Sequence, residues 1–215
     1  MGMVNNFINE VRHEFSSQKL DEQSMASTPI KQLEKWLVEA VDSQVLEANA
    51  MSICTVDENG APSSRVVYAR GVSEEGIVLY TNYNSQKGKD LERNPKVALL
   101  FFYPELERQI RIEGEIQKLP EQESDDYFDA RPTESKLGAW ASEQSNAIES
   151  RATLEERTEF FRKKFGENIP RPPHWGGYIV KPIKFEFWQG RPARLHDRLV
   201  FEKDGENWSI YRVAP

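Results

Sequence analysis

The spacing of apolar residues changes near residue 50 from a helical period to a strand-like period. Before that point, Thr28 can cap a helix start and Pro29 suits the first helical position. Four apolar residues then recur three or four positions apart: Ile30, Leu33, Leu37 and Val41. This pattern predicts a helix from residue 28 to about residue 46.

Beyond residue 50, apolar and polar residues alternate in short segments that are bounded by turn residues, which predicts strands. The strand segments include residues 51–56, 63–72, 76–82, 97–103, 108–119, 176–182, 184–190, 198–203 and 208–213. Helices are expected at 85–93, 120–130, 133–143 and 153–165. We expect about eight strands with helices inserted, which predicts a mainly β (α+β) fold, an antiparallel barrel decorated by helices.

Composition narrows the class of protein. The 215 residues carry 28 Lys and Arg against 35 Asp and Glu, a formal net charge of −7, which argues against a nonspecific nucleic-acid binder. The single cysteine, Cys54, excludes an intrachain disulfide, and no apolar run reaches the roughly 20 residues that span a bilayer. We therefore expect a cytoplasmic protein with no membrane or nucleic-acid partner, formed by a mobile arm at 1–27 and one domain at 28–215.

Three arginines and a histidine gather between Gly190 and Arg198 of this acidic chain. On a strand, Arg194, His196 and Arg198 would share one face, and such a row could bind a phosphate or cover an anionic aromatic ligand. The alternative is a solvated edge in which Asp197 forms a salt bridge with an arginine.

A second basic cluster, Ser85–Lys89, lies where a predicted strand turns into a short helix. Amides at a helix start can bind phosphate, although an ordinary charged helix start has the same composition. Neither GxxxxGK[ST] nor GxGxxG occurs, and the three histidines lie far apart with no HExxH. We expect no P-loop, no dinucleotide motif and no metal site.

A third set consists of Tyr127, Arg131 and Ser135, which are spaced four residues apart. On one helix they would form a phosphate-binding face, but Pro132 interrupts such a helix. The alternative is that Tyr127 and Phe128 pack in the core while Arg131 only ends a helix.

A series of short motifs runs along nearly the whole chain. They are RVVYAR at 65–70, YTN at 80–82, LERQ at 106–109, YF at 127–128, RP at 131–132, GAW at 138–140, QS at 144–145, WGG at 175–177, EFWQG at 186–190, RLHDR at 194–198 and RVAP at 212–215. Together and in this order they resemble the pyridoxamine 5'-phosphate oxidase family, and EFWQG followed by RLHDR is the most specific part.

The resemblance implies an antiparallel, FMN-binding split β-barrel that forms a homodimer, with two FMN sites at the subunit interface, each built from both chains. It implies oxidation of pyridoxamine and pyridoxine 5'-phosphates to pyridoxal 5'-phosphate in vitamin B6 biosynthesis. A hydride would pass from substrate C4' to flavin N5, with release of ammonia from the amine. O2 would then reoxidise the flavin and yield hydrogen peroxide.

The resemblance also implies the site residues. Those expected to bind FMN are Arg65, Val66, Val67, Tyr68, Arg70, Tyr80, Thr81, Gln86, Lys87, Gln109, Gln144, Ser145, Trp188 and Arg198. Those expected to bind the substrate are Arg12, Glu14, Phe15, Arg70, Tyr127, Arg131, Ser135, Arg194, Leu195 and His196. Arg194 and His196, at the face and edge of the pyridine ring, are the expected catalytic residues.

Three residues depart from the family's pattern. Arg70 stands where lysine is usual, Gln86 where arginine is usual, and Phe15 where tyrosine is common. We hypothesise looser FMN binding and altered substrate affinity rather than lost activity. The arm would close over bound substrate as a lid, and a terminus that only packs on the barrel is the alternative.

Two rival functions follow from the same scaffold. One is a protein that binds FMN or pyridoxal 5'-phosphate without turnover, and the other is a flavin reductase or an oxidase of a different small amine. Arg194 and His196 argue against the first rival. The phosphate-binding set of Tyr127, Arg131 and Ser135 argues against the second.

Overall fold

The computed structural model describes residues 14–15 and 19–215, which form two compact units. Of the described residues, the terminal unit contains 14–15, 19–48, 101–111 and 184–215, and the central unit contains 49–100 and 112–183. Three strands contribute residues to both units: β5 (Lys96–Tyr103), β6 (Arg108–Lys118) and β7 (Trp175–Gln189). In the described part of the chain, no helix combines the length and apolar character that a membrane crossing requires.

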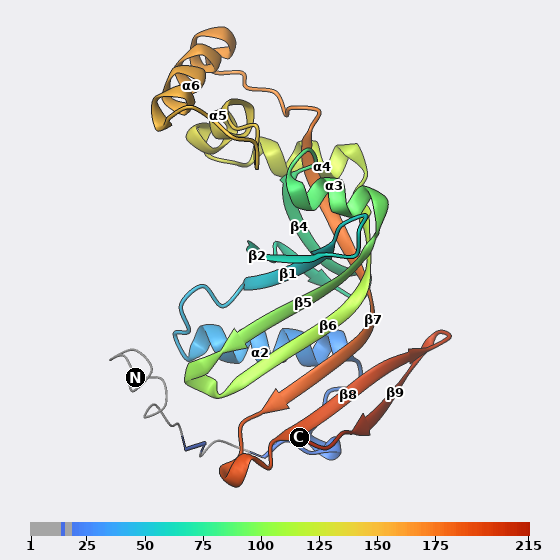
Figure 1. The fold of residues 1–215 in the computed structure, drawn as a ribbon. Helices are drawn as coiled ribbons and strands as arrows, with labels where there is room; N and C mark the ends of the chain where they lie inside the picture. The colour runs from blue at the N-terminus through green and yellow to red at the C-terminus, as the bar shows by residue number, and fades with distance from the viewer. Residues whose placement is uncertain (1–13, 16–18) are drawn as a thin grey trace, which may run out of the picture. The chain divides into compact units, whose positions relative to one another are not determined.

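The central unit joins antiparallel strands to four helices (Figure 1). Its complete elements are β1 (Ala50–Val56), β2 (Pro62–Tyr68), β3 (Gly71–Ser73), β4 (Gly76–Asn82), α3 (Gln86–Arg93), α4 (Glu121–Asp129), α5 (Thr133–Ala141) and α6 (Arg151–Phe165). The strand order is β2-β1-β5-β6-β7-β4-β3, with β1 antiparallel to β2 and β5, and β4 antiparallel to β3 and β7. This confirms the predicted antiparallel architecture with inserted helices.

A small core lies beneath helices α4 and α5 of the central unit. Phe128, Leu137, Ile169 and Trp175 are buried together, and Phe128 meets Trp175 edge to face at 5.2 Å between ring centroids. Burial of these large side chains holds the two helices against β7. As a result, the segment between α4 and α5 has a fixed place beside the sheet.

The terminal unit pairs the second half of β7 with β8 (Asp197–Asp204), and β8 with β9 (Asn207–Arg212), both antiparallel. Its helical elements are η1 (Glu22–Ser24), α2 (Pro29–Asp42), η2 (Pro104–Leu106) and η3 (Pro192–Arg194). As predicted, Thr28 caps α2, accepting from the Lys31 N–H at 3.2 Å. Trp36 of α2 packs edge to face on Phe187 at 5.2 Å.

Helix α2 ends at Asp42, earlier than the predicted end near residue 46. Gln44 has a φ of 58°, and its N–H donates to the carbonyl of Val41. A left-handed residue after the last turn ends a helix, here without the glycine that usually signals it.

Two predicted strands have different bounds in the structure. The segment 63–72 divides into β2 and β3, because the N–H groups of Ala69 and Arg70 bond to different partners, Asn49 and Val78. The segments 176–182 and 184–190 are one continuous strand, β7. Pro182 lies between the stretch that pairs with β4 and the stretch that pairs with β8, so neither pairing needs the N–H that proline lacks.

Gly88 of α3 is a position where a side chain does not fit. A Cβ there would lie 1.9 Å from the carbonyl oxygen of Tyr83, a backbone atom that cannot move freely. We expect Gly88→Ala to lower the free energy of unfolding by about 3 kcal/mol, measured by urea denaturation. Gly138 of α5 is the matched control, because a Cβ there meets nothing within 4 Å and alanine favours a helix. Equal effects of the two substitutions would contradict this assignment.

Candidate functional site

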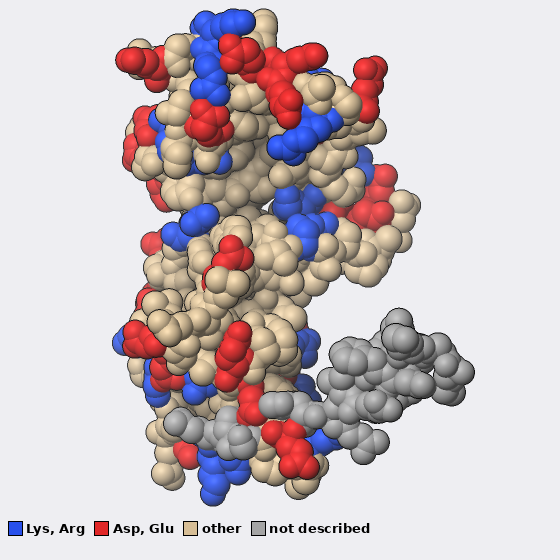
Figure 2. All heavy atoms as spheres, turned by 90° about the vertical axis from the view of Figure 1, so that its left-hand side faces the viewer, with Lys and Arg blue, Asp and Glu red and all other residues tan. Residues whose placement is uncertain are grey.

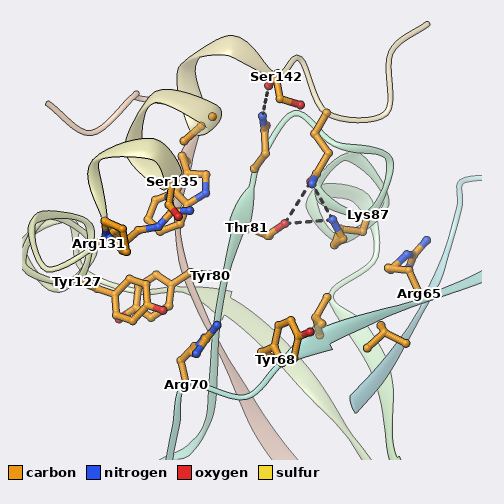
Figure 3. Close-up of a pocket in the computed structure, with 18 of the residues that line it drawn as sticks. Arg65, Tyr68, Arg70, Tyr80, Thr81, Lys87, Tyr127, Arg131, Ser135 and Ser142 are labelled. Atoms are coloured by element: carbon orange, nitrogen blue, oxygen red, sulfur yellow. Dashed lines mark hydrogen bonds between the residues drawn. The ribbon is translucent and has the colours of Figure 1, made fainter. Parts of the chain in front are cut away.

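A cavity of about 840 Å³ opens in the central unit. Its walls come from β2, β4, the start of α3, and the α4–α5 region (Figure 3). Figure 2 shows a face of the molecule that is hollowed beneath the helices at the top, with Lys and Arg side chains on both sides of the hollow. The volume lies in the range of small-molecule and cofactor sites.

Lys87 is the most deeply placed cation of the cavity, with only 7% of the residue exposed. Its Nζ donates to Thr81 Oγ1 at 3.0 Å, Ser85 Oγ at 3.3 Å and Gln144 Oε1 at 3.0 Å. Burial, together with the charge of Arg65, lowers the pKa of Lys87 to about 8. Its three hydrogen-bond acceptors are neutral, so an anion that entered here would gain a full charge interaction.

Arg65 projects from β2 into the same side of the cavity as Lys87 (Figure 3). Its Nη1 donates to Thr55 Oγ1 at 2.8 Å and to the Ile53 carbonyl at 3.3 Å, and its Nη2 donates to Ser63 Oγ at 2.5 Å. These contacts hold the guanidinium in place before any ligand binds.

The other side of the cavity is an aromatic wall with a cation against it. Tyr80 and Tyr127 stack at 3.7 Å between ring centroids with an interplanar angle of 6°, and Trp175 lies nearly parallel to Tyr80 at 5.7 Å. The Arg131 guanidinium sits 4.3 Å from the Trp175 centroid. Burial lowers the pKa of Arg131, and the charge of Arg70 acts in the same direction.

Arg131 holds a buried donor that is unpaired. Its Nη1 has no hydrogen-bond partner among the described residues. Leaving a charged donor buried and unsatisfied costs free energy, which an acceptor from a ligand would recover. Arg131 lies between α4 and α5, so Pro132 does break the single helix that the spacing of Tyr127, Arg131 and Ser135 required. All three nevertheless line the cavity.

The cavity brings together twelve residues that the sequence singled out: Arg65, Val66, Val67, Tyr68, Arg70, Tyr80, Thr81, Lys87, Tyr127, Arg131, Ser135 and Gln144. Two others lie in the central unit without lining it. Gln86 is exposed and donates to Asp90 Oδ1 at 2.8 Å, and Ser145 is exposed with a φ of 73°.

The remaining predicted residues that the structure describes belong to the terminal unit. Arg12 lies outside the described residues, Glu14 and Leu195 are exposed, and Gln109 is half-buried on β6. The roles of all these residues stay predictions.

His196 forms an aromatic cluster in the terminal unit. Its ring lies 4.9 Å from that of Phe15 and 4.6 Å from that of Trp188. The backbone N–H of Arg191 donates to His196 Nδ1 at 3.1 Å, which places the ring proton of the neutral form on Nε2. Burial and the charge of Arg194 lower the pKa of His196, so the neutral form is favoured.

The expected row of Arg194, His196 and Arg198 on one strand face is wrong. β8 begins only at Asp197, and the preceding η3 contains Ala193 and Arg194 with φ of 56° and 61°. Such left-handed residues turn the chain out of an extended path. The salt bridge of the alternative interpretation is present, because Asp197 pairs with Arg191 at 3.5 Å.

Arg198 is held by partners within the terminal unit. Its Nε and Nη2 donate to the two carboxylate oxygens of Glu186 at 3.1 and 2.8 Å, and its Nη1 donates to the Ala214 carbonyl at 2.7 Å. Glu186 raises the pKa of Arg198. This two-pronged ion pair orients the guanidinium rigidly.

Sequence reasoning missed several lining residues: Asn82, Ala130, Pro132, Gly138, Ala139 and Ser142. Asn82 donates through Nδ2 to the Ser142 carbonyl at 3.4 Å. Most of them are small or mid-helix residues that carry no chemical signal in the sequence. Four of them, Asn82, Pro132, Gly138 and Ala139, do lie inside the YTN, RP and GAW motifs, so the motifs were a signal for them.

Two protein-family models match most of this chain. A family model for pyridoxamine 5'-phosphate oxidase matches residues 37–164, and one for the pyridoxine 5'-phosphate oxidase C-terminal dimerisation region matches residues 175–215. Pyridoxine/pyridoxamine 5'-phosphate oxidases from Burkholderia mallei and Burkholderia thailandensis are each 52% identical over 209 residues, which cover 96% of this chain and 98% of theirs.

Solved structures show the same fold. PhzG from Burkholderia lata 383, in complex with tetrahydrophenazine-1-carboxylic acid, has a TM-score of 0.87 and 31% identity over 93% of this chain and all of its own. A pyridoxamine 5'-phosphate oxidase-related, FMN binding protein from Nostoc punctiforme has a TM-score of 0.70 and 16% identity over 89% of this chain and all of its own, a likeness of fold alone. The fold is the predicted split β-barrel, and the chain belongs to the pyridoxamine 5'-phosphate oxidase family.

Proposed function

We propose that this protein is an FMN-dependent oxidase that converts pyridoxamine 5'-phosphate and pyridoxine 5'-phosphate to pyridoxal 5'-phosphate, with O2 as the electron acceptor. One observation carries the proposal. A single cavity holds cations on two opposite sides, Lys87 and Arg65 on one and Arg131 on the other (Figure 3). A flavin nucleotide and a phosphorylated pyridine together offer one phosphate to each side.

The first side fits the phosphate of FMN. Lys87 is a buried cation with neutral partners, and Arg65 is already held beside it. Val66, Val67 and Tyr68 continue along β2 as further lining. When bound, FMN would supply the redox chemistry, since a flavin can accept a hydride and pass electrons to O2.

The second side fits the phosphate ester of the substrate. The buried, unpartnered Nη1 of Arg131 is a donor without an acceptor, and Tyr127 and Ser135 bring hydroxyl groups to the same wall. Arg70 adds a second positive charge. A dianionic phosphate would be oriented by these groups, which fixes the rest of the substrate for reaction.

We further propose a homodimer with two FMN sites at the subunit interface, each built from residues of both chains. Support comes from the matched dimerisation region, because residues 175–215 contain Trp188, Arg194 and His196. His196, neutral with its proton on Nε2, is suited to donate a hydrogen bond to the edge of the pyridine ring. Arg194 would cover the face of that ring.

A second candidate function is oxidation of a phenazine precursor. It is favoured by the likeness to PhzG, at 31% identity and a TM-score of 0.87. PhzG was solved with a carboxylic acid rather than a phosphate ester. The two functions therefore differ in which anion the Arg131 side of the cavity receives.

Anaerobic flavin reduction tests the proposal. We expect the purified protein, loaded with FMN, to lose its visible flavin absorbance when mixed with pyridoxamine 5'-phosphate or with pyridoxine 5'-phosphate. Absorbance should return, with hydrogen peroxide, when air is admitted. Tetrahydrophenazine-1-carboxylic acid serves as the competing substrate. Reduction by that acid and by neither ester would establish the second candidate instead.

A further inference from the structure

Asp90 is a buried carboxylate of α3, 3% exposed, that the proposed mechanism does not use. Its Oδ2 accepts from Thr55 Oγ1 at 2.7 Å and from Ser63 Oγ at 3.4 Å, and its Oδ1 accepts from Gln86 Nε2 at 2.8 Å. Burial alone would raise the pKa of Asp90. Hydrogen bonds from Thr55 and Gln86 and the charge of Arg65 outweigh burial, so the pKa is lowered and the carboxylate is ionised.

Two hydroxyl groups connect this carboxylate to Arg65. The Thr55 hydroxyl has one hydrogen, which it donates to Asp90, so its oxygen faces Arg65 as an acceptor of the Nη1 donor at 2.8 Å. Ser63 Oγ accepts from Nη2 at 2.5 Å and lies 3.4 Å from Asp90. The carboxylate thus sets the direction of hydroxyl groups that hold the guanidinium.

We propose that Asp90 is a positioning residue for the flavin phosphate: through Thr55 and Ser63 it fixes the guanidinium of Arg65 in the orientation that receives the phosphate. This inference rests on the proposed function, because it takes FMN as the ligand of that side of the cavity. Groups that orient the direct ligands of an anion raise affinity because the binding side chain loses less freedom on binding.

The negative charge of Asp90 and its contacts with Thr55 and Ser63 have opposite effects on FMN affinity. A carboxylate close to Arg65 repels a phosphate dianion, so removal of the charge alone would tighten FMN binding. Removal of the positioning contact would weaken it. The direction of the change therefore decides between the two roles.

Flavin titrations of the apoprotein test this inference. Dissociation constants are measured by quenching of flavin fluorescence, with FMN and with riboflavin, which lacks the phosphate. We expect Asp90→Ala to weaken FMN binding about tenfold and to leave riboflavin binding unchanged. Glu92→Ala is the matched control, because it removes an exposed acid from the same helix, and both of its constants should stay within about twofold of wild type.

Thr55→Val provides a second variant that keeps the shape of the buried side chain. It should also weaken FMN binding about tenfold, and the double variant with Asp90→Ala should be no weaker than the weaker single variant, because both act on one chain of contacts. If Asp90→Ala does not fold, the FMN dissociation constant of Thr55→Val tests the positioning role instead.

Three outcomes would overturn the positioning role. They are unchanged or tighter FMN binding by the variants, equal weakening of FMN and riboflavin, and additive effects in the double variant. A wild-type protein that binds neither flavin would instead overturn the proposed function itself, and the inference with it.

Discussion

Replacing Arg131 by leucine is expected to raise the KM for pyridoxamine 5'-phosphate about 100-fold, with a smaller change in kcat. Arg131 is half-buried, and its Nη1 has no partner among the described residues. Two charge-assisted hydrogen bonds to a phosphate in such a place contribute about 3 kcal/mol together, which corresponds to the expected change in KM. Steady-state kinetics with both phosphate esters provides the measurement.

Unphosphorylated pyridoxamine is the control substrate for this variant. It has no group for Arg131 to bind, so its low kcat/KM should be the same in the wild type and in Arg131→Leu. Arg131→Lys should fall between the two, because lysine keeps the charge and loses the planar pair of donors. The assignment of Arg131 to the phosphate ester fails if the KM for the ester is unchanged. It also fails if kcat/KM falls by the same factor for the ester and for unphosphorylated pyridoxamine.

Replacing Lys87 by methionine is expected to weaken FMN binding about 30-fold at pH 7, and in the wild type the FMN affinity should fall as the pH rises above 8. The pKa of Lys87 lies at about 8 in the ligand-free protein because of burial and the charge of Arg65. An adjacent phosphate favours the charged form and raises this pKa again. One lost charge-assisted hydrogen bond of about 2 kcal/mol accounts for the effect of methionine.

The direction of the pH dependence follows from proton uptake. Above pH 8, Lys87 of the ligand-free protein is largely neutral, and FMN binding must return a proton to it, so the dissociation constant rises by up to about tenfold per pH unit. Below pH 8 the lysine is already charged and this dependence disappears. In Lys87→Arg the guanidinium stays charged throughout, and the slope should vanish. Fluorescence titration at a series of pH values would refute the prediction if both proteins gave the same slope.

The contribution of Lys87 to the free energy of unfolding should change with pH in the opposite direction from the FMN affinity. In the unfolded chain a lysine has its ordinary pKa, above the value of Lys87 in the folded protein. Between these two values the unfolded state binds more protons, so the contribution of this residue to stability increases as the pH rises through that window. As the pH rises above 8, the affinity for FMN therefore falls, while the contribution of Lys87 to the stability of the ligand-free protein increases.

The parts of the fold that local chemistry decides could be predicted from the sequence. Thr28 and Pro29 start α2 because a cap and a fixed φ act within one turn, and Gly60 closes the β1–β2 hairpin because it adopts a φ of 82°. The bend at Ala193 and Arg194 could not be predicted in this way. Neither residue type favours a positive φ, so only the surrounding structure selects it.

The candidate site shows the same division. The resemblance to a family identified most of the lining residues, yet their arrangement depends on contacts between distant segments. Lys87 meets Gln144 across 57 positions, and Arg131, in the turn between α4 and α5, packs on Trp175 of β7. In the sequence, Asp90 looks like any other charged residue of a short helix. The hydroxyl groups that donate to it come from two distant strands, so the sequence does not show these contacts.

An anion that binds to Lys87 must replace one of the acceptors to which its ammonium group already donates. An ammonium group has three hydrogens, and in this structure they go to Thr81, Ser85 and Gln144. A phosphate oxygen can take one of them only if a present acceptor gives it up. Gln144 is exposed and can turn to water, whereas Ser85 is buried and caps α3. Arrival of an anion at Lys87 would thus displace Gln144 from its Nζ, while the hydrogen bond from Asn82 to the Ser142 carbonyl still ties the segment after α5 to β4.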